Sequence, residues 1–465
     1  MSPISHGHQG PVPRRDRAQK AEPGGQVVDS WGARARALGT CCAVAVTLGG
    51  WGARAFAGQL AYGVGYGFTY ETNPTAVSSN PVADQHQQVI AGFSYDESTA
   101  DLKARLLVQP EARDYRHDSF PDDTFVYVNG AAVWSIAPKT LDWTVEDRRE
   151  ESRVDLTIVD TPANRTITNT FSTGPDLTLR FGRATGLVLG ARYGEVDVKD
   201  QGKNWRNTGY ARLQYLLSAA SKLNLNYESS LIRAEPAGAV GEVRRDDLYA
   251  RYESRPSPLD EFALEIGATR LTPEGEELPS RRRIKLFYLR HFAPSSGFRA
   301  TLVDFVSDTY IDALTTDSIV IAPPAGNDVY RTRGGGASYF LTSARVRLDL
   351  GGFTQKVEYE TVGDDYDENS ANFSVTWQRA ADFSLNATGQ YAKRFFPDLG
   401  RTDVETNFGV RATYQLSPTI RFVAAAGYEA TDISPIDQRT SNTAVSLFLA
   451  FSSDPLYVPQ SRRRR

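Results

Sequence analysis

A long run of alternating residues opens the main part of the chain and limits the folds open to it. Between Leu60 and Glu71, large apolar side chains occupy every second position and small or polar residues lie between them; the large ones are Leu60, Tyr62, Val64, Tyr66, Phe68 and Tyr70. A period of two is typical of a β-strand, because its side chains point alternately to opposite faces. One face of this strand therefore meets an apolar environment and the other a polar or crowded one.

The same alternation recurs to the end of the chain. The clearest stripes are at 187–193, 223–228, 262–266, 346–350, 383–391, 408–416, 420–428 and 445–451. Short links resembling turns alternate with longer polar links between the stripes. The short links are predicted at 97–100, 137–140, 182–185, 218–221, 255–260, 293–296, 342–344, 379–382 and 417–419. This alternation divides the chain into about twenty strands, with both ends on the side of the short turns.

These features predict an all-β fold consisting of one transmembrane, antiparallel, up-and-down β-barrel of about 20 strands, with 18 as the next count. Hydrocarbon offers no partners for backbone polar groups, so a spanning sheet must close on itself. Short periplasmic turns, long external loops and an even strand number are typical of outer-membrane barrels. A secreted soluble β-protein is the alternative fold. The aromatic-rich stripes, which often end in tyrosine, argue against it.

The composition fits a barrel once it is separated by face. The mean hydropathy is −0.40, which by itself suggests a water-soluble protein, and no apolar run is long enough for a membrane-spanning helix. A barrel accounts for this value, because the mean then combines the residues of a lipid face, a wet lumen and polar loops. The net charge of −4 shows no basic footprint for nucleic acid.

The first 57 residues predict an exported protein. A basic stretch precedes an apolar run at 37–51, and Ala55-Phe56-Ala57 supplies small residues for a cleavage site, which is the layout of a signal peptide. We therefore predict a signal peptide with a basic extension at 1–57, the barrel at 58–453 and a short arginine-ending tail at 454–465. Residues 58–465 contain 45 basic and 53 acidic residues, a net charge of −8. The predicted location is the Gram-negative outer membrane.

Several short segments at the ends of the stripes resemble those of one known family. The first is Tyr70-Glu71-Thr72-Asn73-Pro74, at the end of the first stripe. The other segments that carry the resemblance are Tyr227-Glu228, Arg251-Tyr252-Glu253 and Glu358-Tyr359-Glu360. Together they resemble the β-barrel porin family of Gram-negative bacteria, some members of which are encoded beside exopolysaccharide or exosortase systems. The resemblance implies a pore that serves polysaccharide export.

Motifs for chemistry are scarce. There is no Gly-x-Ser-x-Gly motif, and His86, His117 and His291 lack partners at metal-ligand spacing. We therefore predict a protein that is not an enzyme and has no cofactor and no metal. The acidic clusters at 364–368 and 274–277 are interpreted as solvated loops, with divalent-cation bridging to lipopolysaccharide or calcium binding as the alternative.

A set of polar side chains is predicted to face the lumen and line a pore. They are Lys103, Arg105, Arg192, Asn224, Asn226, Glu228, Glu265, Arg345, Arg347, Asn386, Arg411, Gln415 and Arg421. Charged lumen residues select which solutes pass. The alternative is that they pair across the wall and only stabilise the barrel. The link 309–329 is the candidate for a loop folded into the lumen.

The favoured function is a passive outer-membrane conduit linked to exopolysaccharide export. A general diffusion porin, a non-conducting structural or binding barrel and a secreted soluble β-protein remain the alternatives. The expected partners are outer-membrane lipid and lipopolysaccharide, the barrel-assembly machinery, and a polysaccharide with its export-system proteins. No nucleic-acid partner is expected.

Overall fold

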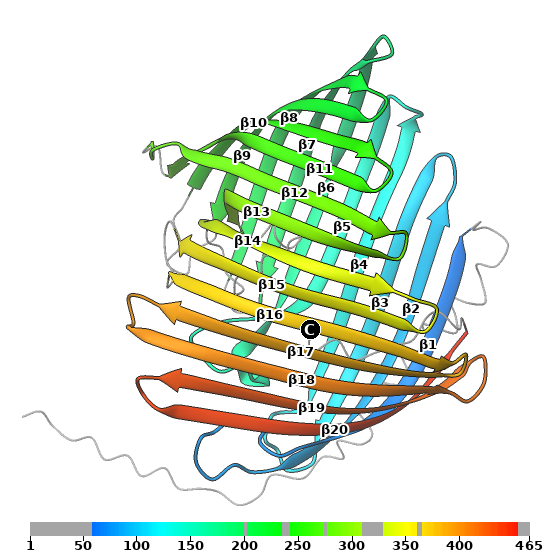
Figure 1. Ribbon diagram of the computed structural model, residues 1–465, viewed down its shortest axis with the longest axis vertical. Helices are drawn as coiled ribbons and strands as arrows, with labels where there is room; N and C mark the ends of the chain where they lie inside the picture. The colour runs from blue at the N-terminus through cyan, green and yellow to red at the C-terminus, as the bar shows by residue number, and fades with distance from the viewer. Residues whose placement is uncertain are drawn as a thin grey trace, which may run out of the picture.

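The strands close into one barrel. The computed structural model describes residues 58–199, 202–234, 242–273, 277–308, 329–359 and 365–453. These residues form a 20-stranded antiparallel sheet in which each strand pairs with its neighbours along the chain, and β1 also pairs with β20 (Figure 1). The predicted fold class and strand number are therefore confirmed.

Most strands are 13–15 residues long, long enough to span a membrane and extend beyond it. The strands of the first half are β1 (Gln59–Glu71), β2 (Asp84–Ser98), β3 (Leu102–Tyr115), β4 (Asp123–Ala137), β5 (Leu141–Arg153), β6 (Arg165–Phe181), β7 (Thr185–Val198), β8 (Gly202–Ser218), β9 (Ser221–Ala234) and β10 (Glu242–Ser257). Those of the second half are β11 (Asp260–Pro273), β12 (Arg281–Ala293), β13 (Ser296–Asp308), β14 (Val329–Thr342), β15 (Val346–Tyr359), β16 (Tyr366–Ala380), β17 (Phe383–Phe396), β18 (Arg401–Gln415), β19 (Ile420–Ser434) and β20 (Gln438–Ser452).

The tight turns coincide with the predicted short links. Residues 138–140 join β4 to β5, and residues 182–184 join β6 to β7. Gly182 has a φ of 84°, which glycine adopts without steric cost. The tight turns lie at one end of the barrel and the long links at the other, and we name these the periplasmic and the external end after the orientation usual in outer-membrane barrels.

The register assigns a face to each strand position. Residues paired across antiparallel strands share a face, and the large apolar residues of β1 are exposed, for example Tyr62 at 47% and Tyr66 at 52%. Tyr62 pairs with Phe93, and Tyr66 with Val89 and Leu449. Following such pairs around the sheet places the apolar stripes on the outer surface and the alternating residues in the lumen.

Close packing holds the seam between β1 and β20. The ring of Phe448 points inward and fills the space above Gly65 and Gly67, where any added Cβ atom would collide with it. Phe448 also packs with Ile90 and Ala450 in a buried cluster. The small residues that alternate with the apolar stripe of β1 therefore make room for an aromatic ring from the last strand.

A pair of substitutions in β17 tests the assignment of faces. Ala387 faces outward and the adjacent Thr388 faces the lumen, both near the middle of the strand. Arginine on the lipid face costs about 2–4 kcal/mol near the bilayer midplane, whereas a wet lumen accepts it. We expect Ala387→Arg to lower the free energy of unfolding, measured by urea titration in lipid vesicles, by that amount, and Thr388→Arg to have little effect. Equal destabilisation by both would contradict the assignment.

The predicted signal peptide at 1–57 and the tail at 454–465 lie outside the described residues. Most of the candidate lumen loop 309–329 does so as well; of it, only Val329 is described. No helix in the described ranges is long and apolar enough to cross a membrane.

Candidate functional site in the lumen

All but one of the residues predicted to line a pore lie on the lumen side of the wall. By register, the inward-facing members are Lys103, Arg105, Arg192, Asn224, Asn226, Glu228, Glu265, Arg347, Asn386, Arg411, Gln415 and Arg421. Arg345 lies in the turn between β14 and β15. The role of these residues in solute passage stays a prediction.

The structure brings several of these residues together. Asn386 is paired with Arg411 between β17 and β18, and Gln415 with Arg421 between β18 and β19. Arg251 Nη1 donates to Glu265 Oε1 at 2.7 Å. Arg192 forms an ion pair with Asp176 and lies against the ring of Tyr210, so the alternative of pairing along the wall applies to part of the set.

The two ends of the lumen differ in exposure. Near the periplasmic turns of β3 and β15 the inward side chains are solvated: the side chain of Arg105 is 81% exposed and that of Arg347 is 68% exposed. On β9 and β11, by contrast, Asn224, Asn226 and Glu265 are buried against neighbouring side chains. Near the external loops they are buried: Arg245 is 1% exposed, Glu368 0% and Arg394 4%. The lumen is therefore open to water on the periplasmic side and packed on the external side. We call its wet part, enclosed by the periplasmic halves of the strands, the vestibule.

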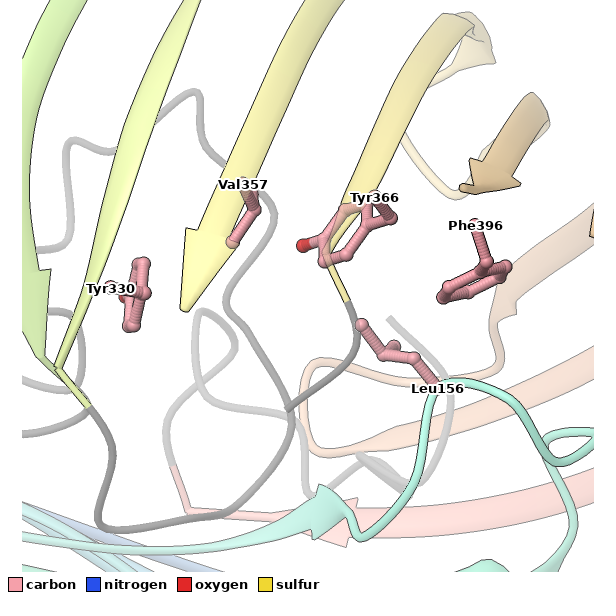
Figure 2. Packing of buried hydrophobic residues seen from close by; sticks show 5 residues of the cluster. All are labelled: Leu156, Tyr330, Val357, Tyr366 and Phe396. Atoms are coloured by element: carbon pink, nitrogen blue, oxygen red, sulfur yellow. The ribbon is translucent and has the colours of Figure 1, made fainter. Parts of the chain in front are cut away.

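The external link between β5 and β6, residues 154–164, contributes to this packing. Its Leu156 is buried in a cluster with Tyr330, Val357, Tyr366 and Phe396, which lie on β14 to β17 (Figure 2). β5 and β15 are ten strands apart in a ring of twenty, so this loop reaches the opposite wall. The contact closes part of the external mouth.

Loop 154–164 has a defined internal structure. Asn164, at the end of the short helix η1 (Pro162–Asn164), donates its side-chain amide to the carbonyl oxygens of Asp155 and Ile158 at 2.7 and 3.0 Å. Arg153 donates to the carbonyl oxygens of Asp155 and Leu156, each at 3.1 Å. These bonds give partners to backbone carbonyl groups that no strand pairing satisfies.

A chain of charges fastens this loop to the far wall. Arg153 Nη1 donates to Glu405 Oε1 at 2.8 Å, and Arg394 Nη1 lies 3.0 Å from Glu405 Oε2. Arg394 Nε donates in turn to Glu368 Oε2 at 2.6 Å. Removing one partner of such a buried pair leaves a charge without compensation. The position of the loop is therefore specified by ion pairs as well as by the burial of Leu156.

The ends of β13 and β14 on the external side of the barrel also turn into the lumen. Leu302 and Val306 have the same orientation along β13, but Leu302 is 50% exposed and Val306 0%. Val306 packs with Ile232, Val243 and Leu271, three inward-facing residues of the β9–β11 wall. The outer part of this strand pair thus leaves the barrel wall and packs against its inner surface.

Asp308, at the end of β13, joins two arginines of the opposite strands, one on β8 and one on β10. Its Oδ2 accepts from Arg206 Nη1 at 2.7 Å and from Arg245 Nη1 at 3.1 Å. From there a ladder of alternating charges runs toward the periplasmic end. Its successive members are Asp308, Arg245, Asp247, Arg283, Glu265, Arg251, Glu253 and Lys222. Charges on this side of the lumen largely compensate one another.

Sequence reasoning identified Glu265 in this ladder but missed Arg153, Leu156, Glu405 and Asp308. Leu156 lies in one of the longer polar links that the sequence predicts, and the apolar residues Leu156, Ile158 and Val159 are the available signal that this link packs against something. Within the described ranges, no group of three or more His, Cys, Asp or Glu side chains is arranged to hold a metal ion.

Comparison with solved structures reveals similar barrels. The protein in the FpvAI–pyocin S2 complex matches with a TM-score of 0.50 at 9% identity, over 85% of this chain and 70% of that one. The chain therefore shares its overall fold with that protein. The FrpB iron transporter from Neisseria meningitidis (F3-3 variant) gives 0.46 at 10% identity, over 84% and 81%. A mutant of the ferric enterobactin receptor PfeA from Pseudomonas aeruginosa gives 0.45 at 11%, over 84% and 80%.

The likeness to these proteins concerns the fold alone. No family model matches the sequence, and no curated protein matches it. The resemblance to the β-barrel porin family therefore stays a prediction, and the cargo has to be argued from the lumen of this barrel.

Proposed function

We propose that this barrel is an outer-membrane conduit that exports an exopolysaccharide, and that loop 154–164 holds its external mouth closed between transport events. The observation that carries the proposal is the contrast between the wet vestibule, with Arg105 81% exposed, and the packed external half, with Glu368 0% exposed. A cargo would enter the open end from the periplasm, which suits export.

The side chains on the inner face of β16 and β17 favour a cargo with many hydroxyl groups. Its inward positions in the vestibule are uncharged and polar: Asn372, Ser374, Thr376, Asn386, Thr388 and Gln390. Amide and hydroxyl groups both donate and accept hydrogen bonds, as sugar hydroxyls do. The resemblance to porins associated with exopolysaccharide systems points to the same class of cargo.

A general diffusion porin fits less well. Such a pore needs a continuous wet path, and here the external half is occupied by Leu156 and by the inward-bent ends of β13 and β14. We expect liposomes that contain the purified protein to exclude small sugars in a swelling assay. Rapid swelling would favour the porin.

Deletion of the gene in its own host tests the export proposal. We expect surface polysaccharide to fall by at least about tenfold, as for loss of a dedicated exit path, and polysaccharide to accumulate in the periplasm. Complementation with the full-length gene should restore export. Unchanged surface polysaccharide in a strain that lacks the barrel would refute the proposal.

A further inference from the structure

One wall of the vestibule carries an excess of basic side chains. This wall runs from β13 through β20 and then from β1 to β4, and we call it the basic wall. Its inward-facing basic residues in the periplasmic halves of the strands are Lys103, Arg105, Arg299, Arg347, Arg411 and Arg421. They come from five different strands and so surround much of the vestibule.

Acidic residues on the basic wall are few. In the described strands of this wall, the inward-facing acidic side chains of the periplasmic halves are Asp96 and Asp349. Each lies beside an arginine, with Arg105 Nε 3.3 Å from Asp96 Oδ1 and Arg347 Nε 3.1 Å from Asp349 Oδ2. The other inward positions are polar, small or apolar, so basic charge outweighs acidic charge there.

The opposite wall differs. On β8 to β12, basic and acidic residues alternate, as in the contacts of Lys222 with Glu253 at 2.6 Å and of Arg251 with Glu265 at 2.7 Å. Positive potential in the vestibule therefore comes mainly from the basic wall. It does not reflect composition, because residues 58–465 have a net charge of −8.

The basic groups can act on a solute in water. The side chains of Arg105 and Arg347 are 81% and 68% exposed, and Lys103, Arg299 and Arg411 are also exposed. A cavity lined by charge of one sign within walls of low dielectric constant raises the local concentration of the opposite ion. Rings of basic side chains select anions in pores.

We infer that the vestibule binds and admits an anionic cargo. If the proposed export function holds, on which this part rests, the cargo is an acidic polysaccharide whose sugars carry carboxylates. Its carboxylates would form ion pairs with the arginines and the lysine of the basic wall. Its sugar hydroxyls would form hydrogen bonds with the uncharged polar side chains of β16 and β17, which lie between the arginines of this wall.

Binding of a charged and a neutral oligosaccharide tests this inference. The full-length protein in detergent is titrated with a fluorescently labelled oligogalacturonate and with a neutral dextran oligomer of equal length, and anisotropy is recorded. We expect the oligogalacturonate to bind at least about tenfold more tightly at low salt, with the difference shrinking as salt screens the charges. Equal affinity for the two oligomers, or binding of neither, would overturn the inference.

A charge reversal on one strand supplies a matched control. Arg347 faces the vestibule, whereas Lys356 lies on the same strand, β15, and faces outward. Arg347→Glu is expected to weaken oligogalacturonate binding by about tenfold, because the new glutamate repels the carboxylates of the ligand. Lys356→Glu is expected to leave binding unchanged. Equal effects of the two reversals would also overturn the inference. The purified protein could still bind the anionic oligomer selectively while the deletion strain keeps its surface polysaccharide. That pair of results would refute only the export role and would leave the anionic cargo in place.

Discussion

Removal of residues 155–163, with Val154 joined to Asn164 through two glycines, is expected to open the part of the external mouth that this loop closes. The backbone N–H of Val154 donates to the carbonyl oxygen of Asn164 at 2.9 Å, so the two ends of the loop already lie together and the deletion can be accommodated. Loss of Leu156 from the mouth should raise single-channel conductance in planar bilayers by at least about tenfold, since the constriction limits ion flow.

Point substitutions in the same loop show whether the packing of Leu156, and not only the presence of the loop, keeps the mouth closed. Leu156 is 8% exposed within the cluster on β14 to β17, whereas Ile158 is 54% exposed. We expect Leu156→Ala to produce frequent openings, because truncation of a buried leucine costs about 2–5 kcal/mol. Ile158→Ala should behave as the unchanged protein. A deletion variant that retains heat-modifiable migration yet stays closed would contradict the role of the loop and would favour a structural or binding barrel.

Substitution of Asp308 by asparagine is expected to destabilise the barrel strongly. Its carboxylate is shared by Arg206 and Arg245, whose side chains are 3% and 1% exposed. Asparagine keeps the shape but leaves two buried cations without this partner. Breaking buried pairs of this kind costs about 3–5 kcal/mol. The measurement is the free energy of unfolding from urea titration in lipid vesicles.

Asp246→Asn is the matched control for this substitution. Asp246 lies on β10 next to Arg245 but faces outward, where it pairs with Arg244, whose side chain is 57% exposed. Exposed ion pairs contribute about 0–1 kcal/mol, so little loss of stability is expected. If Asp308→Asn were as mild as Asp246→Asn, the outer ends of β13 and β14 would not be held in the lumen by these charges.

Much of the fold could be predicted from the sequence because its determinants are local. Alternation such as that from Leu60 to Tyr70 depends only on which residues meet lipid, and a spanning sheet has few ways to satisfy its backbone. The tight turns at 138–140 and 182–184 coincide with predicted links for the same reason. The positions of Asn386, Arg411 and Arg421 on the lumen side followed from the parity of their strands.

The closed mouth could not be predicted in the same way. Leu156 stands in a polar link that has no period, and its partners Tyr366 and Phe396 are more than 200 positions away. Similarly, Val306 follows Leu302 in the same stripe of β13, but Val306 is buried in the lumen, whereas Leu302 is exposed on the outer surface. Periodicity assigns a residue to a face of its strand, yet it does not show where the strand leaves the wall.

The sequence by itself therefore determined the barrel, its strand number and the face of most strand residues, because these follow from the two-residue period and from the demands of a bilayer. Only the tertiary structure decided that one end of the lumen is wet and the other packed. That difference arises from contacts across the barrel, such as Arg153 with Glu405 and Asp308 with Arg206. Such pairs join residues far apart in the chain, and opposite charges occur too often in a sequence to reveal which of them will meet.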